Sequence, residues 1–188
     1  SFDRFLRKDK ETTLPQELEV AGRVVESFLD WFTDILILPG NHELRFLREN
    51  QFQPTFEMLI RLMGLSDSLR SRIAVNVGPN STALYRHCIL SGYRVTHAKN
   101  FSVIPMRVAT RVAAKKRQHV ICAHGHRFGF TYSECGHYLV IDSGGLFDVE
   151  RIDYLNCQDT TLPAVHNGFV SIRNGKARLW GEHLDCEL

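Results

Sequence analysis

The stretch ILILPGNHELRF, residues 35–46, ends an apolar run abruptly at Pro39–Gly40. Four aliphatic residues followed by a Pro-Gly break predict a buried strand, Ile35–Leu38, with a sharp turn at its carboxyl end. Ligands of open α/β sheets gather at the carboxyl ends of strands, and glycine lets the backbone come close to them. A polar loop that caps the following helix is the alternative interpretation. The candidate site residues of this stretch are Asn41, His42 and Glu43.

Composition and charge define a broad class of protein. The chain has 188 residues, of which 44% are hydrophobic and 23% are charged, which is the balance of one folded domain over residues 1–188. A formal net charge of +2 does not by itself require nucleic acid or a membrane as a partner. The five cysteines form no Cys-x-x-Cys pair, and no apolar run approaches the roughly 18 residues of a membrane span. We therefore expect a cytoplasmic protein without a membrane segment.

Helices and strands alternate on both sides of residues 35–46. Residues 16–32 predict an amphipathic helix, and Asn174–Gly175 is typical of a tight hairpin. The apolar face of that helix comprises Leu18, Ala21, Val25, Phe28 and Phe32. Further helices are predicted over 44–50, 54–63 and 106–116. Strands are predicted over 72–77, 82–86, 87–90, 93–97, 119–123, 129–132, 137–142, 168–172 and 177–180. This mixture indicates two packed sheets with helices outside them.

Four histidines stand at the polar ends of apolar strands. His42 follows ILILPGN, His97 ends YRVTH, and His124 and His126 follow HVICA in the sequence AHGH. Gly125 permits a sharp bend, which can direct both neighbouring rings into one cavity. Imidazole is the commonest metal ligand near neutral pH, and an Asn carbonyl suits the same divalent ions. The sequence therefore predicts a metal site, whereas each histidine taken singly also suits an ordinary structural position.

These motifs resemble a known family. GNHE at 40–43, TH at 96–97 and HGH at 124–126 are similar, in order and spacing, to the third, fourth and fifth motifs of the calcineurin-like metallophosphoesterase superfamily. The segments SFDRFLRKD, AHGHRFG and IDSGGL resemble its phage and bacterial branch. The resemblance implies an α/β (α+β) fold, a four-layer αββα sandwich of two mixed β-sheets flanked by helices.

The resemblance also implies a chemistry. Two divalent ions clamp a phosphate while a metal-bound hydroxide attacks phosphorus at this dinuclear centre. Manganese is the expected metal, with iron, zinc or nickel as alternatives. One ion is bound by Asn41, His97 and His124, and the other by His126. By this resemblance, His42 is the expected catalytic residue, which would stabilise the transition state and protonate the leaving oxygen.

Two further residues have two interpretations each. Glu43 orients His42 or serves as an acid in the first helical turn. Arg45 binds a substrate phosphate with its guanidinium or lies on a solvated helix face. The expected function is hydrolysis of a phosphomonoester or phosphodiester, with a nucleotide or nucleic acid among the candidate substrates.

The sequence also departs from the superfamily pattern. Neither an Asp-x-His motif nor a Gly-Asp motif occurs in the chain, although their carboxylates complete the metal site in the family. We expect the chain to be N-terminally incomplete and to lack the first strands of the fold. The alternative is a catalytically inactive scaffold or binding protein on the same fold. The presence of His42 favours the hydrolase, because a scaffold has no need for a transition-state imidazole.

Three other features have mainly structural interpretations. Lys115, Lys116 and Arg117 suit the carboxyl end of a helix dipole better than nucleic-acid contacts. Cys122 is expected to be a buried small hydrophobe rather than a nucleophile. The alternating aromatic residues Phe128, Phe130 and Tyr132 are expected in the core or at its rim.

Overall fold

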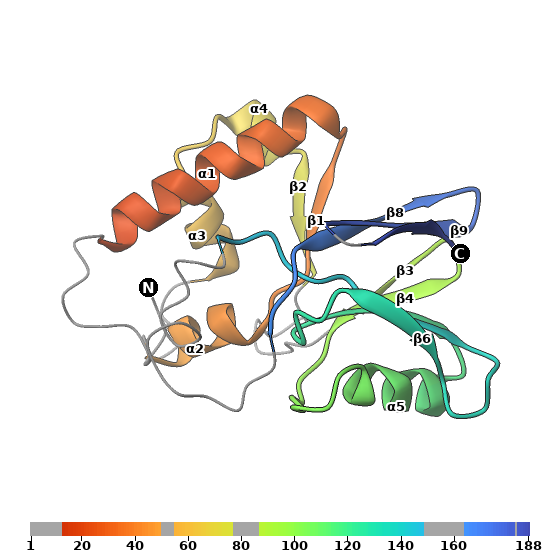
Figure 1. Cartoon of the computed structure of the whole chain (residues 1–188). Coiled ribbons are helices and arrows are strands. Elements are labelled where there is room, and N and C mark those ends of the chain that lie inside the picture. The colour runs from red at the N-terminus through yellow and green to blue at the C-terminus, as the bar shows by residue number, and fades with distance from the viewer. Residues whose placement is uncertain (1–12, 50–54, 77–86, 149–163, 183) are drawn as a thin grey trace. The chain divides into compact units, whose positions relative to one another are not determined.

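The computed structural model describes residues 13–49, 55–76, 87–148, 164–182 and 184–188 (Figure 1). Within these ranges the chain is a mixed α/β structure with several β-sheets, which confirms the coarse fold class. It divides into two compact units, residues 1–86 and residues 87–188. The single domain over residues 1–188 stays a prediction.

The first unit contains four helices and a two-stranded sheet among its described residues. In chain order these are α1 (Leu14–Trp31), β1 (Ile35–Ile37), α2 (Asn41–Glu49), α3 (Phe56–Leu62), α4 (Asp67–Arg70) and β2 (Ile73–Val75). Strands β1 and β2 pair in parallel. The predicted helix over 44–50 begins earlier, at Asn41, so that Asn41, His42 and Glu43 form its first turn. The short helix α4 has no counterpart in the sequence prediction.

The buried face of α1 differs from the predicted one. Leu18, Gly22 and Leu29 are buried, whereas Phe28 is 40% exposed and Phe32 is 59% exposed. The reason is a close approach at Gly22, where an added Cβ would lie 2.1 Å from the carbonyl oxygen of Met63. Because glycine allows α3 to pack directly on the α1 backbone, the helix turns this face, rather than the phenylalanines, toward the core.

The second unit contains two sheets and one helix among its described residues. In chain order these are β3 (His87–Leu90), β4 (Tyr93–His97), α5 (Arg107–Lys116), β5 (His119–Ala123), β6 (Gly129–Tyr132), β7 (Leu139–Asp142), β8 (Gly168–Arg173), β9 (Lys176–Gly181) and β10 (Asp185–Glu187). The five-stranded sheet has the order β3-β4-β5-β7-β6, and the antiparallel three-stranded sheet has the order β10-β9-β8. The hairpin predicted at Asn174–Gly175 joins β8 to β9.

The second unit has three layers, with the five-stranded sheet in the middle (Figure 1). Helix α5 covers one face, where Ala109 and Ala113 pack against Val120 and Val140. The three-stranded sheet covers the other face, where Leu179 of β9 packs in the cluster that includes Ile121 and Ile141. Both faces of β5 and β7 are therefore buried, as is typical of parallel central strands.

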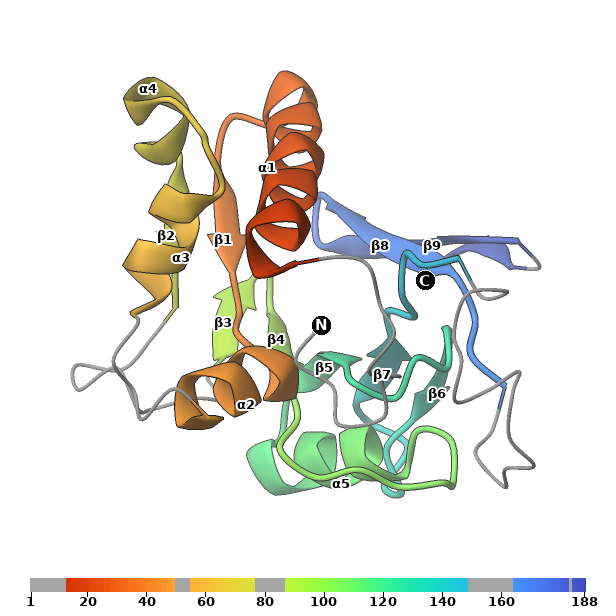
Figure 2. The ribbon, with the colours of Figure 1, turned by 90° about the vertical axis from the view of Figure 1, so that its left-hand side faces the viewer.

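Three neighbouring strands of the central sheet run parallel, so their carboxyl ends share one edge. Strand β4 pairs in parallel with β5, and β5 pairs in parallel with β7. Figure 2 shows the three strands side by side above α5. His97 ends β4, Ala123 ends β5 and Asp142 ends β7. The register thus brings the polar segments that follow three separate strands to one place.

Strand β10 is present although no strand was predicted there, and the predicted strand 82–86 lies outside the described residues. In the part of the chain that the structure describes, none of the helices combines the length and apolar character that crossing a membrane requires.

Candidate functional site

His97 and His124 form the centre of the candidate site. His97 pairs with Ala123 in the β4/β5 ladder, so His124 follows directly at the same edge. The two half-buried imidazole rings lie with their centroids 4.7 Å apart and their planes tilted by 42°. The Nδ1 atom of His97 lies 3.2 Å from the carbonyl oxygen of Ala98. The structure therefore brings together two of the four predicted metal ligands.

The HGH turn holds its two histidines in an unusual backbone conformation. His124 has φ 93° and His126 has φ 55°, both in the region that side chains other than glycine rarely adopt. Each such residue costs about 1–3 kcal/mol and persists where surrounding contacts enforce it, often at functional sites. The His126 ring packs against Phe147 with the ring centroids 5.3 Å apart. The His126 carbonyl accepts a 3.0 Å hydrogen bond from the His166 amide.

Asp142 lies beneath this turn and was missed by sequence reasoning. It is 4% exposed, and it pairs with Cys122 in the β5/β7 ladder. Its Oδ1 accepts a 3.0 Å hydrogen bond from the Gly144 amide. An added Cβ on Gly125 would lie 2.3 Å from its Oδ2, so the turn is closed around the carboxylate and requires glycine at its centre. The sequence signal that could have identified Asp142 is its position at the end of an apolar strand, which is the criterion by which the histidines were selected.

Burial dominates the electrostatics of Asp142. Desolvation raises the pKa of its carboxyl group above the ordinary value, because the charged form loses water that the protein replaces only in part. The amides of Gly144 and Arg127 and the charge of the Arg127 guanidinium oppose this shift. Arg127 also donates a hydrogen bond to the carbonyl of Ala164. The Asp142 carboxylate thus interacts both with the Gly144 amide, which follows β7, and with Arg127, which follows the HGH turn.

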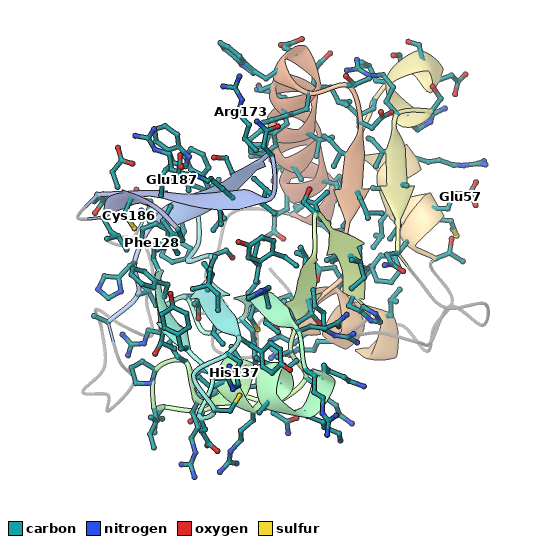
Figure 3. All side chains as sticks on the ribbon, turned by 90° about the vertical axis from the view of Figure 1, so that its right-hand side faces the viewer. Glu57, Phe128, His137, Arg173, Cys186 and Glu187 are labelled. Carbon is teal, nitrogen blue, oxygen red and sulfur yellow. The ribbon has the colours of Figure 1, made fainter. Side chains whose placement is uncertain are left out.

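Phe128 supports the turn from the side of the three-stranded sheet. Its half-buried ring packs in the same cluster as Cys186 of β10 (Figure 3). Three glycines make room for the Phe128 side chain, since an added Cβ on any of them would lie within 3 Å of one of its atoms. They are Gly144 at 2.9 Å, Gly168 at 2.3 Å and Gly181 at 2.2 Å. The prediction of a core or rim position is therefore confirmed for Phe128, whereas Phe130 and Tyr132 of β6 are exposed.

A small cavity of about 30 Å³ lies beside His124, which is room for a water molecule or an ion. Phe101, Arg107, Cys122 and Asp142 are among its lining residues. Burial raises the pKa of the Cys122 thiol to about 12, so the thiol is protonated near neutral pH. Because only the thiolate is a strong nucleophile, Cys122 acts as a buried hydrophobe, as the sequence indicated.

The remaining predicted site residues lie on α2 in the first unit. Asn41 is half-buried at the first position of the helix, and His42 beside it is exposed. The Glu43 carboxylate accepts a 2.9 Å hydrogen bond from the Gly40 amide, which is the contact of an acid in a first helical turn. Arg45 is half-buried on the same helix. The predicted ligands and the catalytic residue are thus divided between the two units.

In the described ranges, no three His, Cys, Asp or Glu side chains are gathered closely enough to hold a metal ion. Within these ranges the pair His97–His124 therefore has no third such side chain gathered beside it. Compared with protein-family models, curated proteins and solved structures, the chain matches none of them.

Proposed function

We propose that the chain is a metal-dependent phosphoesterase that hydrolyses a phosphomonoester or phosphodiester, on a four-layer αββα fold of the calcineurin-like type. The observation that carries the proposal is the His97–His124 pair, with its rings 4.7 Å apart at the carboxyl ends of two parallel strands. The strained HGH turn and the small cavity beside His124 support a site at this edge. The resemblance of the GNHE, TH and HGH motifs supplies the reaction class.

The donor chemistry of the pair suits divalent transition metals, since neutral imidazoles bind manganese, iron, zinc and nickel. His97 and His124 would hold one ion, and His126 would hold the second. Divalent ions bound there would polarise the phosphoryl group and activate the attacking water. Asp142 would hold the HGH turn, and with it His124 and His126, in its conformation, because the Asp142 carboxylate fills the inside of that turn.

His42 would act on the leaving group. It is exposed in the first turn of α2, where helix amides and the dipole favour a bound phosphate. An imidazolium at this position can protonate the departing oxygen as the ester bond breaks. Arg45, one turn further along the same helix, would contact a second phosphate oxygen.

The second candidate is an inactive scaffold or binding protein on the same fold. The observation that favours it is the lack of the Asp-x-His and Gly-Asp motifs in this sequence. Without their carboxylates, a two-metal site has mostly neutral ligands and binds divalent ions weakly. The two candidates differ in metal content and in turnover.

The test combines elemental analysis with hydrolysis of bis-p-nitrophenyl phosphate and p-nitrophenyl phosphate in added manganese. The native chain is compared with His42→Ala and His124→Ala, and His137→Ala is the matched control, because His137 is an exposed histidine outside the site (Figure 3). We expect His42→Ala to lower turnover by about 10²–10⁴-fold with its metal retained. His124→Ala is expected to lower both metal content and turnover.

Native chain that binds no metal and releases no p-nitrophenol would support the scaffold instead. If the His137→Ala control lowers turnover as much as His42→Ala does, the proposed role of His42 is refuted. These two outcomes separate the existence of the activity from the residue that performs it.

A further inference from the structure

A groove of about 600 Å³ leads away from the candidate site along α5. Its wall residues include Phe101 and, from α5, Arg107, Arg111 and Lys115. Phe101 and Arg107 also line the cavity beside His124, so the groove and the cavity adjoin. The Phe101 ring stands edge-on to the His124 ring, with the centroids 5.7 Å apart.

The charged side chains that line this groove are all positive. Residues 98–118 include no Asp or Glu, while their basic residues are Lys99, Arg107, Arg111, Lys115, Lys116 and Arg117, all of them exposed. Among described residues, none of the three wall residues of α5 forms an ion pair. Four-residue spacing places these cations about 6 Å apart along one side of the helix. A row of this kind matches the regularly spaced phosphates of an extended nucleic-acid strand.

The helix dipole does not account for this row. Lys115 and Lys116 in the last turn of α5 are favoured by the dipole, but Arg107 lies in the first turn, where a positive charge is disfavoured. No acidic residue occupies that first turn. Arg107 is therefore placed against the local electrostatic preference, at the end of the groove nearest to His124.

Besides a row of cations, a site for single-stranded nucleic acid needs an aromatic ring on which a base can stack, and Phe101 supplies this ring. It is 50% exposed at the mouth of the groove, and an exposed ring of this kind stacks with a base regardless of sequence. We infer that the α5 groove binds single-stranded nucleic acid, whose phosphodiester is the substrate of the histidine site. This inference rests on the proposed phosphoesterase function and names its substrate class.

The test measures binding of a fluorescein-labelled oligothymidylate of about 20 nucleotides by fluorescence anisotropy, with the full chain in EDTA so that no turnover occurs. We expect Arg111→Glu to weaken binding at least about tenfold and to reduce the slope of log K against log salt by about 0.7. The matched control is Arg173→Glu, an exposed arginine on β8 on the opposite side of the second unit from α5 (Figure 3). The control should change affinity less than about twofold.

Phe101→Ala separates nucleic acid from other polyanions, with the exposed Phe130→Ala as its control. We expect Phe101→Ala to weaken oligothymidylate binding about tenfold, because stacking is lost, and to leave heparin binding unchanged. If Arg111→Glu and Arg173→Glu weaken oligothymidylate binding equally, the assignment of the α5 groove as the binding site is overturned. An unchanged affinity of Phe101→Ala for oligothymidylate would overturn the nucleic-acid assignment.

The two proposals fail in different ways. A chain that hydrolyses bis-p-nitrophenyl phosphate but does not bind oligothymidylate refutes this inference alone. A chain that binds oligothymidylate through Arg111 but has no esterase activity refutes the phosphoesterase and, with it, the assignment of nucleic acid as a substrate.

Discussion

Gly125 is the residue whose backbone bears most directly on the geometry of the candidate site. It lies between two histidines in the left-handed region, and the buried Asp142 carboxylate fills the space that a side chain would need. A turn of this kind tolerates little change, because the carboxylate is itself held by the Gly144 amide. The positions of both imidazoles therefore depend on one residue that contributes no functional group.

We expect Gly125→Ala to lower the free energy of unfolding by about 1–3 kcal/mol through overpacking against Asp142. Urea denaturation measures this change, and cobalt binding followed by absorption measures the loss of the site. Gly136→Ala is the control, because open space surrounds an added Cβ there, so that only its backbone conformation, with φ 73°, opposes alanine. If the two variants bind cobalt equally well, Gly125 does not position the histidines.

The cysteines give a second prediction at this scale. Hydrogen bonding with Ser133 lowers the pKa of the exposed Cys135 thiol, whereas burial raises the pKa of Cys122 to about 12. A lowered pKa means more thiolate at a given pH, so iodoacetamide should modify Cys135 before Cys122 and at a pH below the ordinary thiol range. Mass spectrometry of the folded chain between about pH 7 and pH 9 checks this order. Modification of Cys122 at the same rate would contradict it.

Among the elements, the β8–β9 hairpin shows how a local signal defines a register. Asn174 has φ 53° and Gly175 has φ 78°, the two positive values of a tight hairpin turn that matches the strand twist. Arg173 then pairs with Lys176, and the register places Leu179 in the core. The turn residues thus fix the register, and the alternating apolar residues Ala177 and Leu179 decide which face of β9 is buried.

Replacing Gly175 by Ala is expected to lower the free energy of unfolding by about 1 kcal/mol, because alanine is disfavoured in the left-handed region. Arg173→Ala in the same hairpin is the control, since its side chain is exposed. Urea midpoints of the two variants are compared. Equal urea midpoints for the two variants would show that glycine is not preferred at this position of the turn.

At the scale of the whole molecule, each core cluster lies within one unit. Leu18, Phe46 and Phe56 belong to the core of residues 1–86, whereas Ile121 and Ala113 belong to the two clusters of residues 87–188. A segment with its own hydrophobic core meets the main requirement for independent folding.

We expect the fragment 87–188 to fold by itself, because its central sheet is covered on both faces by its own elements. Dispersed amide signals in a two-dimensional NMR spectrum and a cooperative urea transition would show this. The full chain is the reference. A fragment with the spectrum of an unfolded chain would mean that residues 1–86 complete its core.

The sequence by itself determined most of the helices and strands and the polar strand ends, because hydrophobic periodicity and turn residues act over a few neighbours. It identified His97 and His124 singly, and it missed α4 and β10, which are too short for a periodic signal. Only the tertiary structure decided that the two imidazoles meet, since this depends on β4 and β5 pairing in register. The roles of Asp142 and of the glycines around Phe128 arise in the same way, because segments far apart in the chain pack closely only after the sheets have formed.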